Sequence, residues 1–230
     1  MKSFAKYISA LAAMLVTVSC LDKLPSDGIP SDEAISTAEE VSQAVTGIYA
    51  SFKSGALYSG ILTLLPDIQA DLAYAVNGFS NTYGNVWRWD IQPNNEEITA
   101  AWAALYGVIA RCNFLLDRTP DIKKHLTDDS EVEAVEYYEG EAYFARALAY
   151  SELAKLWCGN YEGREEAMKE PGLIISTTYH EENAAKRSSL AESYDFIISD
   201  LEEAEKRLKP EDLSKDNNVY YDSQYFSIYT

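Results

Sequence analysis

The stretch from Glu131 to Trp157 decides the fold class, and it reads EVEAVEYYEGEAYFARALAYSELAKLW. It contains no proline and is rich in Ala and Glu, which are strong helix formers, until Gly159 closes the pattern. Small residues at Ala142, Ala145 and Ala149 share one face of such a helix and let a neighbouring helix approach closely. We therefore predict a long helix that packs against other helices.

Two capping boxes mark the start of further helices on either side of this stretch. Thr37 with Glu40 precedes an apolar stripe that Gly55 ends. Ser189 with Glu192 precedes a second stripe, which continues to Leu208. Both segments repeat apolar residues at helical spacing.

Two more apolar segments lie between these helices. Residues 96–117 carry a helical stripe, with Pro120 beyond its end, and should form an antiparallel pair with 131–157. Residues 57–76 form a segment that we expect to be well buried, and Pro66 should kink its helix or restart it at Asp67.

The order of elements is helix after helix, without alternating strands. Residues 159–188 are irregular apart from a short β-prone run at 173–178. This order predicts an all-α fold, either a bundle or a helical-repeat array. Trp102 and Leu105 match the start of a tetratricopeptide unit, but the rest of that signature is not spaced as the repeat requires.

The first residues have the layout of an export signal. Lys2 and Lys6 precede an apolar run, 7–18, that is too short to span a bilayer and leads to Cys20. Because the signal ends in Ser-Cys, we predict a lipoprotein signal peptide at 1–19, lipidation of Cys20 and a tether at 20–31. The alternative is a plain secretory signal in which Cys20 is only a small hydrophobic residue.

Composition excludes several classes of function. The 230 residues contain 19 basic and 37 acidic side chains, a net charge of −18 that disfavours nucleic-acid binding. Cys112 and Cys158 form no disulfide framework, and we interpret them as small buried hydrophobic residues. His125 and His180 lie far apart without cysteine partners, so we expect no metal site and no cofactor.

The candidate ligand site is a long irregular loop at 77–95. Indole rings stack on the apolar faces of sugars, while Asn and Asp side chains hydrogen-bond to hydroxyl groups. The alternative is that one of the two tryptophans fills the core below the loop. The predicted ligand-binding residues are Asn81, Tyr83, Trp87, Trp89, Asp90 and Asn94.

No arrangement of residues indicates an enzyme. The adjacent acids Glu96–Glu97, Asp128–Asp129 and Glu165–Glu166 point about 100° apart on a helix, so they do not converge on one bond. We expect them to provide charge at helix starts. Asn113 and Arg146 are polar residues on buried stripes, and we interpret both as structural.

Several segments, in this order, resemble the SusD/RagB family of outer-membrane nutrient-binding lipoproteins. The segment LDKLP after Cys20 and EEVSQAVTGIY at 39–49 are similar to the family's start and its first helix. WAALYGVIARCN at 102–113 resembles its helix of Trp, Tyr, Ile and Ala-Asn. EAYFARAL at 141–148 matches its most specific motif, and YDFIISDL at 194–201 resembles the segment before its later helices.

This resemblance implies an all-α, tetratricopeptide-like helical array with long irregular loops. It also implies a cell-surface lipoprotein of the outer membrane that is not an enzyme. It would bind glycans, or sometimes peptides, and deliver them to a TonB-dependent SusC-like transporter. A helical domain at 32–208 and an irregular tail at 209–230 are expected. Members are usually about twice as long, so a truncated gene, a frameshift or an incomplete sequence is implied; the alternatives are a lipid-anchored scaffold for protein–protein interaction or a non-functional fragment.

Overall fold

The computed structural model describes residues 35–76, 78, 81–179 and 186–208. The residues from Ser36 onward belong to one compact unit, which is the part considered below. The predicted signal peptide, tether and tail lie outside the described residues, as do Cys20 and His180. The elements are α2 (Ala38–Phe52), α3 (Ile61–Gln69), α4 (Gly84–Trp87), α5 (Glu96–His125), α6 (Asp129–Trp157), α7 (Arg164–Ala167), β1 (Pro171–Ile174), β2 (Arg187–Ser189) and α8 (Leu190–Arg207).

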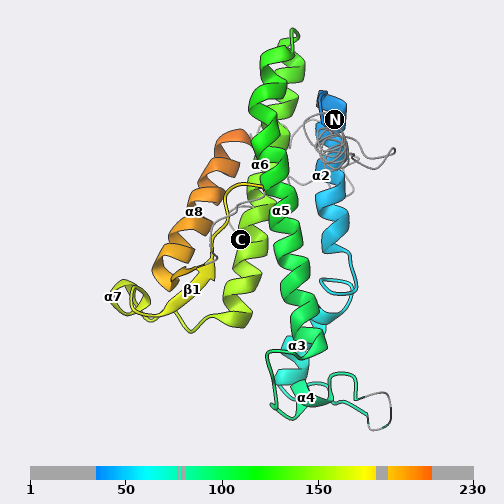
Figure 1. Cartoon of the computed structure of the whole chain (residues 1–230), viewed down its shortest axis with the longest axis vertical. Helices are drawn as coiled ribbons and strands as arrows, with labels where there is room; N and C mark the ends of the chain where they lie inside the picture. Colours follow the sequence, from blue (N-terminus) through cyan, green and yellow to red (C-terminus); the bar gives the residue numbers. More distant parts are fainter. Residues whose placement is uncertain (1–34, 77, 79–80, 180–185, 209–230) are drawn as a thin grey trace, which may run out of the picture. The chain divides into compact units, whose positions relative to one another are not determined.

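Helix α6 is the central element of the unit, and the prediction of a long helix with helical neighbours is confirmed. It packs against α2, α5 and α8 (Figure 1). From Glu139 to Ala147 every residue except Tyr143 is buried. Such a helix needs small side chains on several faces. At Gly140, a Cβ would lie 2.9 Å from the Cβ of Arg207, so glycine permits the close approach of the end of α8.

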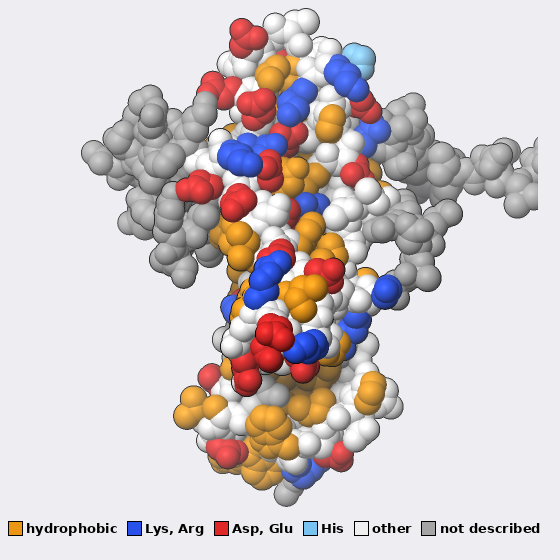
Figure 2. Space-filling view, turned by 90° about the vertical axis from the view of Figure 1, so that its left-hand side faces the viewer, with side chains coloured by type: hydrophobic (Ala, Val, Ile, Leu, Met, Phe, Trp, Pro, Cys, Tyr) orange, Lys and Arg blue, Asp and Glu red, His pale blue; other side chains and the backbone are white. Residues whose placement is uncertain are grey.

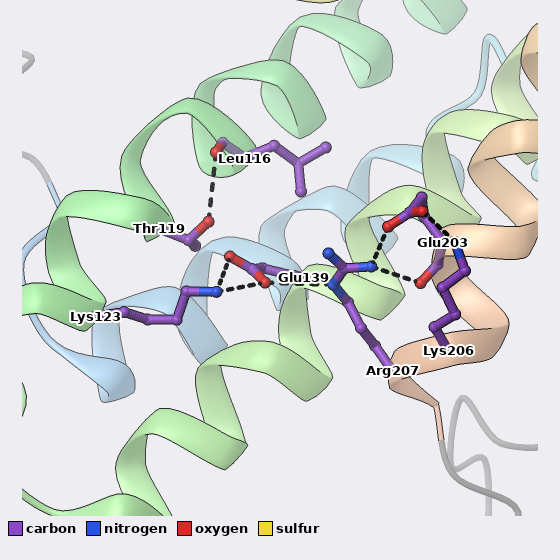
Figure 3. A network of polar contacts seen from close by, with 7 residues as sticks. All are labelled: Leu116, Thr119, Lys123, Glu139, Glu203, Lys206 and Arg207. Atoms are coloured by element: carbon purple, nitrogen blue, oxygen red, sulfur yellow. Dashed lines mark hydrogen bonds and ion pairs between the residues drawn. The ribbon is translucent and has the colours of Figure 1, made fainter.

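Helix α5 is longer than the sequence pattern predicts. It runs antiparallel to α6 (Figure 1) and continues through Pro120 to His125, so the expected end near Asp117 is wrong. Pro120 has no amide hydrogen for the carbonyl of Leu116. The Thr119 hydroxyl donates to that carbonyl instead, at 3.4 Å (Figure 3). This side-chain bond satisfies the acceptor that proline leaves without its usual partner.

Among the described helices, α5 is the one whose length and composition would also suit a membrane span. Its buried residues, from Ala101 to Ile122, pack against α2 and α6 in the helical unit. The apolar character of α5 is therefore that of a core helix.

Both predicted capping boxes are confirmed. The Thr37 and Ser189 hydroxyls accept from the amides of Glu40 and Glu192, and each glutamate returns a bond to the cap backbone. Bonds from Ser189 lower the pKa of Glu192, and bonds from Ser36 and Thr37 lower that of Glu40. Helix α2 ends at Phe52, slightly before Gly55.

The segment after α2 departs from the prediction that it is well buried. At Pro66, helix α3 continues and ends at Gln69, so the alternative of a new helix from Asp67 is excluded. The residues that follow are not well buried: Leu72, Tyr74 and Val76 are among the most exposed apolar side chains described. The buried apolar residues of the segment are Leu57, Leu62, Leu65 and Ile68.

A two-stranded antiparallel sheet lies within the region predicted to be irregular. Strand β1 starts at Pro171, two residues before the predicted β-prone run, and ends at Ile174, where it pairs with Arg187 of β2. The Tyr106 hydroxyl bonds to both the N–H and the carbonyl of Ile174. The Tyr150 hydroxyl does the same for Ser176. Two phenol groups thus satisfy the backbone of alternate residues, as a neighbouring strand would.

A buried ion pair joins α6 to α8. The Arg146 guanidinium donates to both oxygens of Asp200 at 2.7 Å, and its Nη1 donates to Asn113 Oδ1 at the same distance. Asn113 in turn donates to the Ser176 carbonyl at 3.0 Å. The structural interpretation of Asn113 and Arg146 is confirmed, because their side chains connect α5, α6, α8 and the segment after β1.

A second polar network lies where the end of α8 meets α5 and α6. The buried carboxylate of Glu139 accepts from Lys123 at 2.9 Å and from Arg207 at 3.4 Å (Figure 3). Arg207 also bonds to Glu203, which pairs with Lys206. Two cations from different helices thus neutralise one buried carboxylate, as an acid in this position requires.

The remaining acids and Cys112 take the positions expected of them, whereas Cys158 does not. Glu96–Glu97 and Glu165–Glu166 lie in the first turns of α5 and α7, and Asp128 caps α6. Cys112 is buried, as predicted, whereas Cys158 is only partly buried, and both are free thiols. Burial raises the pKa of Cys112 to about 12, so its thiol should be unreactive.

The two Arg–Asp pairs of α8 offer a matched test of what holds the helices together. Asp200→Ala should lower the free energy of unfolding by about 3–5 kcal/mol, because it leaves the buried Arg146 guanidinium without its carboxylate. Asp195 makes an equally short bidentate pair with Arg164, but both side chains are exposed, and Asp195→Ala should have little effect. Urea denaturation followed by circular dichroism measures both variants. Equal losses in the free energy of unfolding would contradict a special contribution of the buried Arg146–Asp200 pair.

Candidate functional site

The predicted ligand loop is built on a hydrophobic cluster formed by α3 and α4. Leu65 and Ile68 of α3 and Val86 of α4 are its buried centre. Trp87 packs on this cluster, and its ring lies 6.5 Å from that of Tyr74. The loop is therefore not wholly irregular, since it contains the single turn α4 and has a core of its own.

The two candidate tryptophans have different environments. Trp87 is partly buried against the α3–α4 cluster, the position of a core residue. Trp89 is 63% exposed. The structure thus places one indole under the loop and leaves the other open to solvent.

Trp89 occupies the position after α4 that glycine usually takes. The Trp89 amide donates to Val86 at 3.0 Å and the Asp90 amide to Asn85 at 2.9 Å, which is the pair of bonds that closes a Schellman motif. The residue at this position must adopt the left-handed conformation, and Trp89 has φ = 58°. A tryptophan held there costs backbone energy that glycine would not.

Positive φ values recur along the loop. Asn81 and Tyr83 also have φ near 58°, so three of the six predicted ligand residues adopt a conformation that L-residues rarely adopt. The Tyr83 amide donates to Glu97 Oε1 of α5 at 2.6 Å, which fastens the loop to the helix that follows it. Strained backbone of this kind concentrates at functional sites.

The polar candidates divide into two groups. Asn81 is bonded to Asn85 and Arg88 within the loop. Asp90 and Asn94 are exposed, and Asp90 accepts from Gln92 at 3.1 Å. Burial, and to a lesser extent the Glu97 carboxylate, raise the pKa of Tyr83, which keeps its phenol neutral. The structure therefore leaves Trp89, Asp90 and Asn94 exposed to solvent, and uses Asn81 within the loop.

Two tryptophans outside the predicted set border the same loop. Trp102 of α5 and Trp157, the last residue of α6, meet edge to face at 5.1 Å. They line an open pocket of about 410 Å³, whose other wall includes loop residues 91–93. In the sequence, Trp102 lies within one predicted helix and Trp157 at the end of another, and no local pattern indicates that they meet.

The exposed apolar side chains form a further surface at this end of the unit. Figure 2 shows hydrophobic side chains gathered at the lower end, where Figure 1 places α3 and α4. In the segment from α3 to the residue after the C-cap of α4, the large apolar side chains that are at least 40% exposed are Leu64, Leu72, Tyr74, Val76 and Trp89. Within the described part of the chain, no three His, Cys, Asp or Glu residues are grouped so as to hold a metal ion.

The backbone at Trp89 predicts a gain in stability on substitution. Trp89→Gly should raise the free energy of unfolding by about 1 kcal/mol, because glycine adopts positive φ without strain. Trp89→Ala removes the same exposed ring but keeps the strained backbone, so it should bring no such gain. Thermal denaturation of both variants measures the difference, and equal stability of the two would contradict strain at this residue.

Comparison with known proteins supplies the family. The SusD-like family model, described as "Starch-binding associating with outer membrane", matches residues 20–224. SusD-like protein P2 of Formosa agariphila is 26% identical over 216 residues, which is 94% of this chain and 40% of that protein. SusD-like protein P38 of the same organism is 29% identical over 119 residues, or 52% of this chain and 20% of that protein. The chain thus spans less than half the length of these relatives.

Solved structures agree on the fold. A SusD superfamily protein from Bacteroides thetaiotaomicron has a TM-score of 0.63 at 20% identity, with 76% of this chain and 38% of that chain covered. One from Bacteroides fragilis has a TM-score of 0.63 at 22% identity, with 81% and 42% covered. The predicted all-α, tetratricopeptide-like fold is confirmed. With the helical order, the caps and the family model in agreement, this chain belongs to the SusD-like family.

Proposed function

We propose that this protein captures glycans at the cell surface and delivers them to a TonB-dependent SusC-like transporter of the outer membrane. The family description, starch binding in association with the outer membrane, supports this role. The observation that carries the proposal is the exposed indole of Trp89 on a loop that also displays Asp90 and Asn94. An aromatic face with polar neighbours suits a sugar, which has apolar ring faces and hydroxyl edges.

The proposal gives the loop residues separate roles. Trp89 stacks on a sugar ring, and the exposed Asp90 and Asn94 side chains bond to its hydroxyl groups. Trp87 and Tyr83 support the loop from the α3–α4 cluster, on which both pack. This division follows the burial of each side chain, because a ring packed into the cluster has less surface to offer a ligand.

The two acids next to the loop, Glu96 and Glu97, fit a protein that binds its ligand without reacting with it. Glu97 is bonded to the Tyr83 amide, and its neighbour Glu96 lies in the first turn of α5. Since these carboxylates serve the loop and the helix start, we propose a receptor rather than a hydrolase. A peptide is the second ligand class, because exposed aromatic residues also accept apolar side chains.

The surface location depends on the N-terminal segment. We propose that residues 1–19 are a lipoprotein signal, that acyl chains on Cys20 hold the protein in the outer membrane, and that 20–31 form a tether before the helical domain at 32–208. More than one acyl chain gives stable anchoring. The residues at 209–230 are proposed to form an irregular tail.

Lipidation is tested by metabolic labelling in the host. Wild-type protein should incorporate labelled palmitate, and Cys20→Ser should abolish the label, because only the thiol at this position follows the signal pattern. Cys158→Ser, which removes a partly buried thiol of the helical unit, is the control and should keep the label. An unlabelled wild-type protein would contradict the anchor.

Glycan binding is tested by calorimetric titration of the protein with soluble starch and a panel of neutral and acidic oligosaccharides. Trp89→Ala should weaken the binding of the recognised glycan by about tenfold or more, because it removes the stacking surface. Tyr161→Ala removes an exposed aromatic ring next to α7, outside the loop, and should leave the affinity unchanged. Absence of binding to every glycan, or equal affinity of Trp89→Ala and wild type, would contradict the proposal.

A further inference from the structure

Three polar side chains of the loop form a closed set of hydrogen bonds next to Trp89. Arg88 Nη2 donates to Oδ1 of Asn81 and to Oδ1 of Asn85, both at 2.9 Å. Asn81 Nδ2 donates to Asn85 Oδ1, also at 2.9 Å. We call these three residues the Arg88 clamp. It joins the segment before α4 to the helix and to the residue that caps it.

We propose that the Arg88 clamp positions the Trp89 indole for binding and is not itself a ligand contact. This inference rests on the proposed glycan site, and it assigns a role to Arg88 and Asn85 that the sequence pattern did not indicate. It also changes the role predicted for Asn81, which becomes a positioning residue and no longer a ligand contact.

The single turn of α4 needs such support. A helix this short is unstable by itself, because nucleating a turn fixes several residues for one hydrogen bond. The hydrophobic cluster holds α4 from below through Val86 and Trp87. The Arg88 clamp holds α4 from the exposed side. The turn that precedes Trp89 is therefore fixed on two sides.

The backbone at Trp89 makes this support necessary. Left-handed tryptophan persists only when its surroundings outweigh the strain. Arg88 is the residue directly before Trp89 and forms the C-cap of α4. The two bonds from the Arg88 guanidinium to asparagine oxygens fix this C-cap. Because Trp89 follows directly, its indole should then leave the turn in one direction.

Gly84 shows that the chain leaves room for the clamp. A Cβ at this position would lie 2.0 Å from Asn81 Oδ1 and 3.2 Å from Arg88 Nη1. Any larger residue would therefore require the Asn81 side chain, which bonds to Arg88, to shift. Glycine at this position, which has no left-handed backbone to explain it, is accounted for by the space that the clamp occupies.

The clamp also limits what Arg88 can do for a ligand. An arginine that recognises an acidic sugar uses its planar donor edge for the carboxylate or sulfate. Here the Nη2 donor of Arg88 already bonds to two asparagine oxygens.

The clamp affects affinity through the Trp89 indole. Holding the indole in place before binding lowers the entropy cost of ordering it, and that cost corresponds to a change in affinity of about three- to tenfold.

The experiment uses fluorine NMR together with the glycan titration. Growth on 5-fluorotryptophan labels the four tryptophans of the chain, and a Trp89→Phe variant identifies the Trp89 signal. Without ligand, Arg88→Ala should move that signal toward the shift of free fluorotryptophan and should leave the Trp102 and Trp157 signals unchanged. The affinity for the recognised glycan should fall about three- to tenfold.

Two further variants make the test specific. Asn81→Ala should move the Trp89 signal in the same way, and the double variant with Arg88→Ala should lose little more affinity than either single variant, because both disrupt one clamp. Arg164→Ala removes an exposed arginine of α7 and should change neither readout. Circular dichroism should show the same helix content for all variants, since α4 is a single turn.

Each failure has a separate meaning. An unchanged Trp89 signal in both Arg88→Ala and Asn81→Ala would overturn the clamp. Lost affinity with an unchanged Trp89 signal would also overturn it, because Arg88 would then contact the ligand directly. A protein that binds no glycan would overturn the proposed function alone, since the signal of the unliganded protein still reports whether the clamp holds the indole.

Discussion

The helical unit depends on one charge that is almost fully buried. The Arg146 guanidinium projects from a part of α6 where most residues are buried, and its partners come from α8 and α5. A buried charge without a carboxylate would be very unfavourable, so the position of Asp200 fixes α8 against α6. Asn113 extends the same constraint to the segment after β1. Apolar packing could be satisfied in several registers, whereas this set of directed bonds is satisfied in one.

Local sequence rules predicted the helices well where the signal is itself local. The boxes at Thr37 and Ser189 begin helices because hydroxyl and carboxylate groups satisfy nearby amides. The same rules failed at Pro120, where a single neighbouring hydroxyl supplies what the proline lacks. They failed again after Gln69, where α3 ends and the apolar residues that follow are exposed to solvent. Whether an apolar residue is covered depends on elements distant in the sequence, and no periodicity contains that information.

The candidate site shows the same division. The clustering of Asn, Gly and Trp residues was enough to locate the loop. It did not indicate which of the two indoles faces solvent. That choice depends on α3, whose Leu65 and Ile68 form the cluster on which Trp87 rests. Arg88 was not singled out because a lone arginine in a loop has no distinctive pattern. Its role is visible only once the fold brings Asn81 and Asn85 to the same point.

The distance in sequence between Arg146 and Asp200 bears on which pieces of the chain can fold by themselves. These residues are separated by 54 positions, and Asp200 lies in α8, the last helix that the structure describes. A piece that stops before α8 would contain the Arg146 guanidinium without the carboxylate that neutralises it. A stable fragment of this unit should therefore need α8, however well α5 and α6 pair with each other.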